Sequence, residues 1–311
     1  MSALPAHDRL YRAKRVLLVG AGGGYDVLGG VPLFTELKER GIVVDFASVS
    51  FTALESLARA RADPDASGLY RVEASAAVTT CYCPEAWLAR WLEERQGHER
   101  PVWGLSKAGV RPMREALRVL TRRLDADLVV LVDGGIDLIL RGDETSIGTP
   151  SEDLATLCAT AGLDRPSLAM CIGFGTEIRE GISHAQVLER IAELQRLGAF
   201  LGATSLDSST AAGRSYREAL DFVAAGQHDH RGSHVQGVVR AAMEGQFGSP
   251  VADVWISPLA ALCWFFDVPG LASSHLFLGH LETTESIFDV TTIIRGCRKS
   301  LDIRAPSNIP I

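Results

Sequence analysis

Residues 16–30, VLLVGAGGGYDVLGG, decide the fold of this chain. Four apolar residues run directly into a glycine-rich stretch, which is typical of a buried strand that ends in a tight turn. Val31, Phe34 and Leu37 then recur at helical spacing, and Gly41 follows as a stop signal. This part of the chain therefore predicts a strand, a glycine loop and a helix in direct succession.

The same alternation of apolar strands and amphipathic helices continues along the chain. Further strands are expected at 43–50, 128–135, 167–175, 199–206 and 251–257. Further helices are expected at 111–124, 152–162, 184–198, 215–226 and 235–245. Strands that are apolar throughout and alternate with helices are typical of a mostly parallel sheet covered on both faces. We therefore predict an α/β fold: a three-layer, Rossmann-like, mainly parallel twisted sheet with helices on both faces.

One domain is expected to account for the whole chain. Its 311 residues are 47% hydrophobic, which is enough for a large core. The sequence contains no internal repeat, no low-complexity tract and no Pro/Gly/Ser-rich linker. We expect a single α/β domain over 1–311, with decorations near 62–105 and 270–311.

Charge and hydropathy exclude several kinds of partner. The net charge of −7 leaves no basic excess, so no nucleic-acid partner is expected. The first residues lack the apolar core of a signal peptide, and Asp253 and Pro258 interrupt the longest apolar run, so no membrane segment is expected either. These features favour a cytoplasmic protein with reduced thiols. The run WISPLAALCWFF (255–266) favours either plain core or a homo-oligomer interface.

The glycine loop predicts a ligand site at the end of the first strand. Gly22, Gly23 and Gly24 can present backbone N–H groups to an anion at the start of a helix, or they can simply allow a tight turn. Asp26 can cap that helix or contact the ligand itself. A nicotinamide cofactor would need an acid after the second strand, where Ser48 and Ser50 stand instead. A methyl donor would need similar acids, so both readings stay as alternatives.

Acidic residues gather after the third long strand, which is where a parallel sheet binds its ligands. The expected ligand-binding residues there are Gly134, Gly135, Asp137, Arg141, Asp143 and Glu144, and Asp133 is the expected catalytic carboxylate. Carboxylates with adjacent glycines can hold Mg²⁺, a ribose or a substrate amine. The alternative is a polar loop whose acids cap turns, followed by a helix capped by Ser151.

The fourth strand leads into GFGTEIREGISHAQ (173–186), which contributes Gly173 and Gly175 as ligand contacts and Glu177 and His184 as catalytic candidates. A histidine at a helix start beside a cleft can serve as an acid or base, or simply pack behind Ser183 as the helix cap. A further group, His228, His230 and His234, can bind metal or lie solvated in a loop. We assign no metal ligands from the sequence.

These motifs resemble a family of bacterial and archaeal proteins known as domain of unknown function 1152. The resemblance rests on VGAGGGYDVLGG, DGGIDLILRGDETSIGTPSEDL, GFGTEIREGISHAQVLERIAEL and the ending RAPSNIPI. It implies that 22–26, 133–135, 141–144 and 173–184 are the marked segments of the family. It names no reaction.

Taken together, these features predict a small-molecule enzyme that performs hydrolysis or group transfer on a polar or phosphorylated metabolite. The substrate is expected to bind at the carboxyl ends of the strands. The alternatives are an NAD(P)- or methyl-donor-dependent enzyme and a non-catalytic ligand-binding module. No cofactor is identified, although Mg²⁺ with a nucleotide is one candidate.

Overall fold

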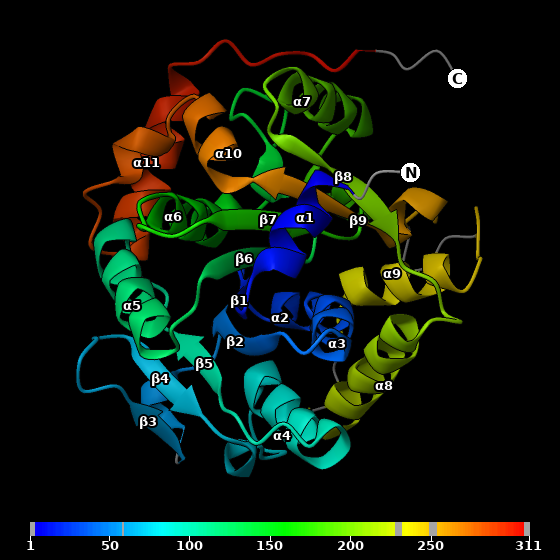
Figure 1. Ribbon diagram of the computed structural model, residues 1–311. Coiled ribbons are helices and arrows are strands. Elements are labelled where there is room, and N and C mark those ends of the chain that lie inside the picture. Colours follow the sequence, from blue (N-terminus) through cyan, green and yellow to red (C-terminus); the bar gives the residue numbers. More distant parts are fainter. Residues whose placement is uncertain (1–3, 58, 228–231, 249–253, 308–311) are drawn as a thin grey trace.

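A computed structural model describes residues 4–57, 59–227, 232–248 and 254–307 of the chain (Figure 1). Its centre is one nine-stranded sheet in the order β3-β4-β5-β2-β1-β6-β7-β9-β8. The strands are β1 (Arg15–Gly20), β2 (Val43–Val49), β3 (Ala60–Ala62), β4 (Leu69–Val72), β5 (Val102–Leu105), β6 (Leu128–Asp133), β7 (Ser167–Cys171), β8 (Phe200–Ser205) and β9 (Leu262–Asp267).

The centre of the sheet is parallel, as predicted. Five adjacent strands, β5, β2, β1, β6 and β7, pair in parallel. Antiparallel pairs flank them on both sides: β3 and β4 at one edge, β9 and β8 at the other. Because β3 and β8 each pair with a reversed strand, both point in the same direction as the centre. The sheet is therefore mixed, with a parallel core.

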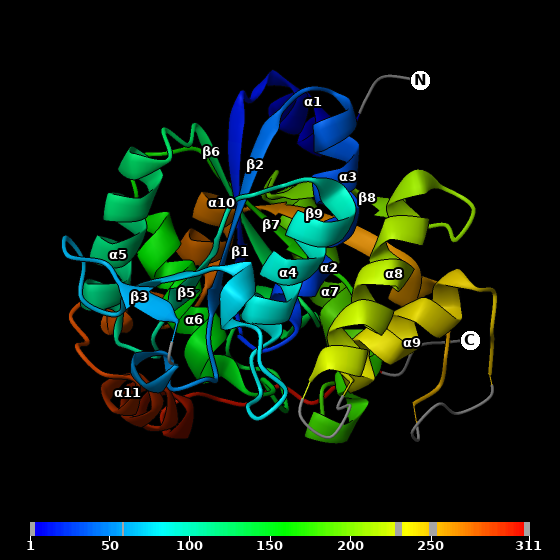
Figure 2. The same ribbon diagram turned by 90° about the horizontal axis from the view of Figure 1, so that it is seen from below.

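Helices cover both faces of the sheet, so the predicted three-layer architecture is confirmed (Figures 1 and 2). One core contains residues of α1 (Pro5–Arg12), α2 (Asp26–Gly29), α3 (Val31–Glu39), α4 (Pro84–Gln96), α8 (Ala211–Gly226) and α9 (His234–Met243). The other contains residues of α5 (Val110–Arg123), α6 (Pro150–Ala161), α7 (His184–Arg196), α10 (Val268–Ser274) and α11 (Ile287–Lys299). Along β1, Val16 and Leu18 enter the first core whereas Leu17 and Val19 enter the second, as the two-residue repeat of a strand requires.

The strand expected at 251–257 is wrong. Residues 251–253 lie outside the described part, and among 254–257 only Val254 forms an isolated bridge. The last strand is instead β9, within the run that was expected to be core or an interface. Residues 259–266 are apolar throughout and show no period, so the sequence could not separate a strand from other buried structure there.

Two expected helix caps are also wrong. Thr149, not Ser151, occupies the N-cap position of α6, and Ser151 lies in the first turn with its hydroxyl 2.9 Å from that of Thr291. Tyr25 occupies the N-cap position of α2, and Asp26 is the first residue of that helix. In both cases the helix begins earlier than expected, by two residues for α6 and by one residue for α2.

The segments expected as decorations contain regular structure. Residues 62–105 include β4, α4 and β5, and β5 is part of the parallel centre. Residues 270–307 include most of α10 and all of α11, which pack on α6. Among the described residues, no helix is both long and apolar enough to cross a membrane.

The topology singles out one place on the sheet. From β1 the chain moves to β2 and β5 on one side, then returns to β6 on the other side of β1. The connections after β1 and β6 therefore diverge at neighbouring strand ends. In open parallel sheets, this switch point is where ligands bind, beyond the carboxyl ends of the strands.

Candidate functional site

The glycine loop after β1 folds around a carboxylate of the protein itself. Gly23 and Gly24 adopt positive φ angles of 99° and 61°, which favour glycine. The turn that results brings the Gly22 N–H within 2.8 Å of Asp26 Oδ2. Backbone N–H groups of Gly23 and Gly134 also hydrogen-bond this carboxylate. The donors that the sequence predicted for a ligand anion are thus directed at Asp26.

A second carboxylate ends the neighbouring strand β6. Asp133 is the last residue of that strand and is 3% exposed. Its Oδ2 accepts a hydrogen bond from the Leu138 N–H at 3.3 Å. The thiol of Cys171, its partner in register on β7, also hydrogen-bonds this carboxyl group. Asp133 is therefore held in place at the switch point of the sheet.

A third carboxylate, Asp153, reaches the same place from helix α6. One oxygen from each of Asp26, Asp133 and Asp153 lies within 4.8 Å of the others. Thr156, one turn further along α6, donates its hydroxyl to the Ala21 carbonyl at 2.9 Å and ties the helix to the glycine loop. Asp153 Oδ1 is buried and has no hydrogen-bond partner among the described residues.

Asp137 and Glu177 form a carboxyl pair beside these three aspartates. Asp137 begins the short helix η3 (Asp137–Ile139) and is 6% exposed. Glu177 comes from the loop after β7, and its Oε2 accepts the Ile136 N–H at 2.7 Å. The two carboxyl groups interact directly, and this interaction lowers the pKa of Asp137 and raises the pKa of Glu177.

Burial and mutual repulsion raise the pKa of all five carboxyl groups. Burial is the main cause for each, and repulsion by neighbouring carboxylates adds to it. The pKa of Asp26 rises to about 7 and that of Asp137 to about 6. For Asp133, Asp153 and Glu177 the pKa lies well above the usual range. The ammonium group of Lys107 pairs at 2.8 Å with Glu152 of α6, which is not one of these five carboxyl groups.

Three glycines let the backbone approach the acidic cluster closely. A Cβ atom at Gly22 would lie 2.7 Å from both carboxylate oxygens of Asp153. At Gly134 it would lie 2.5 Å from Asp26 Oδ1, and at Gly135 it would lie 2.7 Å from Glu177 Oε1. These positions therefore need glycine for space.

We expect Gly134→Ala to displace Asp26 and to lower the free energy of unfolding by roughly 1–3 kcal/mol, as overpacking does. Gly296→Ala is the matched control, because its added Cβ meets no described atom within 4 Å inside α11. Alanine should stabilise that helix by up to about 1 kcal/mol. Denaturant titrations of both variants measure the difference, and equal effects would contradict it.

Arg141, Asp143 and Glu144 do not join the acidic cluster but form a separate ion-pair group. Asp143 pairs with Arg141 and, at 3.0 Å, with Arg304 near the C-terminal end. Glu144 accepts the Arg141 backbone N–H at 2.8 Å. Burial alone would raise the pKa of Asp143, but hydrogen bonds from Arg141 and Arg304 outweigh it and keep this pKa low. The group fastens residues near 304 to the loop after β6.

Asp143→Asn should therefore weaken the fold without affecting the acidic cluster. We expect a loss of about 1.5–3 kcal/mol of unfolding free energy, typical of a hydrogen bond to a charged partner. Ligand responses of the protein in thermal-shift assays should not change. A variant that keeps wild-type stability but loses its ligand response would contradict this assignment.

The remaining predicted residues lie around the cluster. Gly23 and Gly24 pack under Phe51 and Tyr82. Gly173 and Gly175 adopt positive φ angles, and Gly175 lies against His184. The His184 ring packs on Phe174 at the start of α7, and its Nε2 is buried without a described partner. His228 and His230 lie outside the described residues, and His234 begins α9.

Sequence reasoning missed Asp153, Gln236 and Glu85. Asp153 was assigned only to a helix start, where acids are common. Gln236 reaches Gly134 from α9, with its Nε2 2.9 Å from where a Cβ would be. Glu85, fully buried on α4, contacts Ser48 and Ser50 at the end of β2. No local pattern marks Gln236 or Glu85, because both come from distant helices, and Asp153 lies in a quoted motif that does not show where its side chain points.

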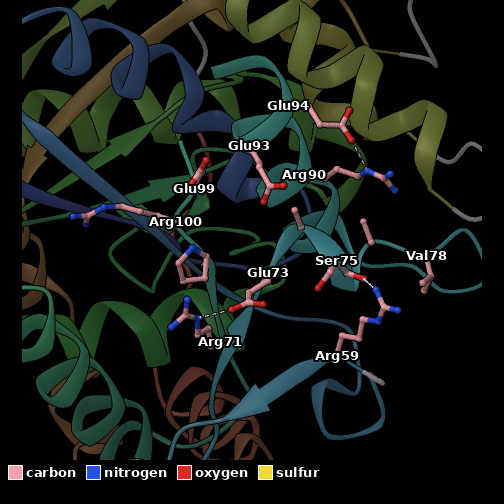
Figure 3. Close-up of a pocket in the computed structure, with 13 residues that line it drawn as sticks. Arg59, Arg71, Glu73, Ser75, Val78, Arg90, Glu93, Glu94, Glu99 and Arg100 are labelled. Carbon is pink, nitrogen blue, oxygen red and sulfur yellow. Dashed lines mark hydrogen bonds and ion pairs between the residues drawn. The ribbon is translucent and has the colours of Figure 1, made fainter. Parts of the chain in front are cut away.

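Two surface cavities differ in their relation to this site. The cavity in Figure 3, of about 490 Å³, includes Arg100 and Pro101 at the amino end of β5. Four of its charged side chains pair with one another, Arg71 with Glu73 at 3.0 Å and Arg90 with Glu94 at 2.8 Å (Figure 3). Ligands of parallel sheets bind at the opposite ends of the strands, so we do not assign it a function.

The other cavity, of about 650 Å³, borders the acidic cluster. Gly148 and Thr149 line it, and the Thr149 N–H lies 3.3 Å from Asp137 Oδ2. Helix α11 contributes Arg295, Arg298 and Lys299 to its opposite wall. A basic cavity thus adjoins the acidic cluster.

Fold and site together define an α/β protein with an acidic centre at the switch point of its sheet. The model of the family described as "Protein of unknown function (DUF1152)" matches residues 99–298, which is more than half of the chain. The chain belongs to this family, which confirms the resemblance. No curated protein and no solved structure matches it.

Proposed function

We propose that this protein is a small-molecule enzyme that performs hydrolysis or group transfer on a polar or phosphorylated metabolite. The observation that carries the proposal is the convergence of five carboxyl groups at the switch point of the sheet. Burying carboxylates beside one another is unfavourable for folding. Such arrangements are typical of sites where acid–base or cation chemistry offsets that cost.

Asp137 and Glu177 are the proposed acid–base pair. Two carboxyl groups that share one proton present an acid and a base at the same place. Glu177 is half-buried and can therefore meet a substrate or water, whereas Asp137 is buried. Asp133, the predicted catalytic carboxylate, would instead help to bind the reacting group.

The basic cavity supports a phosphorylated or otherwise anionic substrate. Arg295 and Lys299 are exposed on its wall, and Thr149 connects the cavity to Asp137. An anionic group held by these side chains would leave the rest of the molecule near the acid–base pair. Recognition of a phosphate by Arg and Lys is consistent with the hydrolysis or transfer expected from the sequence.

The test is a turnover assay of the full chain with nucleoside phosphates and sugar phosphates, each with and without Mg²⁺. Phosphate release and mass spectrometry of the products detect hydrolysis and transfer. We expect Glu177→Gln to lower the rate at least about 100-fold, as loss of a general acid or base does. Asp143→Asn is the matched control and should retain activity. Activity that survives Glu177→Gln unchanged would overturn the assignment.

A second candidate is an NAD(P)- or methyl-donor-dependent enzyme, favoured by Glu85. This fully buried residue of α4 contacts Ser48 and Ser50, at the strand end where the sequence lacks an acid. Phe51 lies beside Gly23 and Gly24, is 51% exposed, and already carries the Lys107 ammonium over its ring at 3.9 Å from the centroid. A thermal shift with NAD(P) or a methyl donor alone would support this candidate. Binding of either without turnover would instead favour a ligand-binding module.

The expected homo-oligomer stays a prediction. Phe247 and Trp255 form an exposed aromatic pair with ring centroids 5.8 Å apart. Such pairs favour contact with another surface. Light scattering of the full chain measures its mass directly.

A further inference from the structure

We infer that Asp26, Asp133 and Asp153 bind one divalent cation of the oxygen-preferring class, Mg²⁺ or Mn²⁺. The three side chains come from separate elements: the start of α2, the end of β6 and helix α6. This inference deepens the proposed function because both rest on the same site. Cation binding can be measured without turnover, so the two can fail separately.

The spacing of the oxygens fits such an ion. One oxygen from each aspartate lies within 4.8 Å of the others. An octahedral ion with bonds of about 2.1 Å places neighbouring ligands about 3 Å apart and opposite ligands about 4.2 Å apart. The three oxygens thus need only small rotations to share one ion, and water or substrate would complete its coordination.

Asp153 provides an independent reason to expect a ligand. Its side chain is 5% exposed, and its Oδ1 has no hydrogen-bond partner in the described parts of the chain. A buried carboxylate oxygen without a donor is strongly unfavourable. This oxygen lies on the side of Gly22, as does Asp26 Oδ2. A cation between the two would satisfy it.

The surroundings hold the ligands in position. The Gly22 N–H donates to Asp26 Oδ2 and the Leu138 N–H donates to Asp133 Oδ2, so both carboxylates are held in position. Such supporting hydrogen bonds are typical of metal ligands. Glycine at 22 and 134 keeps the space between these carboxylates free of side chains.

The ligand set favours hard cations over zinc or copper. All three candidate ligands are carboxylates, which Mg²⁺ and Mn²⁺ prefer, whereas zinc and copper favour histidine and cysteine. Three negative charges around a divalent ion also leave little net charge in the site. We therefore name Mg²⁺ as the ligand and Mn²⁺ as its spectroscopic substitute.

The experiment is titration of the full chain with Mn²⁺, following free Mn²⁺ by electron paramagnetic resonance, with Mg²⁺ as competitor. We expect one bound Mn²⁺ per wild-type chain and competition by Mg²⁺. Asp153→Asn should weaken binding at least about 100-fold, more than loss of a supporting residue does. Asp26→Asn is a second ligand variant, and circular dichroism verifies that both fold.

Asp143→Asn is the matched control, since it removes a buried carboxylate that is already paired with arginine. It should bind Mn²⁺ within about twofold of wild type. No binding by wild type, or equal binding by Asp153→Asn, would overturn the inference. Mn²⁺ binding with no turnover in the substrate panel would leave the cation site standing and remove the proposed function. Turnover that EDTA does not affect would remove the cation site and leave the proposed function standing.

Discussion

Asp133→Asn should make the metal-free protein more stable while abolishing its activity. The wild-type carboxylate is 3% exposed and lies beside Asp137, Asp153 and Asp26, which repel it. An asparagine keeps the size and the acceptor oxygen for the Leu138 N–H but removes the buried charge. We expect the free energy of unfolding at pH 8 to rise, because burial and repulsion by the neighbouring carboxylates make the ionised form of Asp133 unfavourable in the folded protein.

In the presence of Mg²⁺, the wild-type protein should become more stable than Asp133→Asn. The wild-type protein gains stability in Mg²⁺ by mass action, about 2.7 kcal/mol at a hundredfold excess over Kd, whereas Asp133→Asn gains none. Activity of the variant should fall at least about 100-fold. Denaturant titrations with and without Mg²⁺, together with the turnover assay, test both statements. A variant that is less stable without metal and fully active would show that Asp133 has a structural role.

Glu85→Gln should stabilise the protein by roughly 3 kcal/mol at pH 8 and by less than about 1 kcal/mol at pH 5. Burial raises the pKa of Glu85 from 4.5 to about 7 in the folded protein. Between these values the folded state binds the proton more tightly than the unfolded chain, so stability falls as pH rises. The full effect, present above about pH 7, is roughly 3 kcal/mol. Glutamine cannot ionise, so the Glu85→Gln variant does not lose this stability as pH rises.

Chemical unfolding of both proteins at several pH values measures the difference. We expect it to grow from near zero below pH 4.5 to its full value above about pH 7. Glu85 contacts Ser48, Ser50 and Cys83 rather than the acidic cluster, so the comparison reports on this residue alone. A stability difference that is the same at pH 5 and pH 8 would contradict the account.

Part of the fold follows from local sequence, because several central strands are apolar runs, and two of them end in glycine or aspartate. Residues 16–20 and 128–133 each carry both signals, and both form central parallel strands. The reversed direction of β9 could not be predicted in the same way. Its direction depends on pairing with β7 and β8, which lie far away in the sequence.

The residues of the candidate site could likewise be predicted only in part. Asp26, Asp133, Asp137 and Glu177 each follow a strand closely, so the rule that parallel strands end at one edge brings them together. Asp153 enters from within α6, where an acid has an ordinary role near the helix start. Asp143 looked equivalent to Asp137 because distance along the sequence does not show which way a loop turns. The loop carries Asp143 toward Arg304 instead.

The most direct test of the acidic centre is an anomalous-difference map from crystals of the full chain grown with Mn²⁺. We expect a peak between Asp26, Asp133 and Asp153, with Mn–O distances of about 2.1–2.2 Å. A map with no peak there at saturating Mn²⁺, or with Mn²⁺ bound only at surface acids, would contradict it.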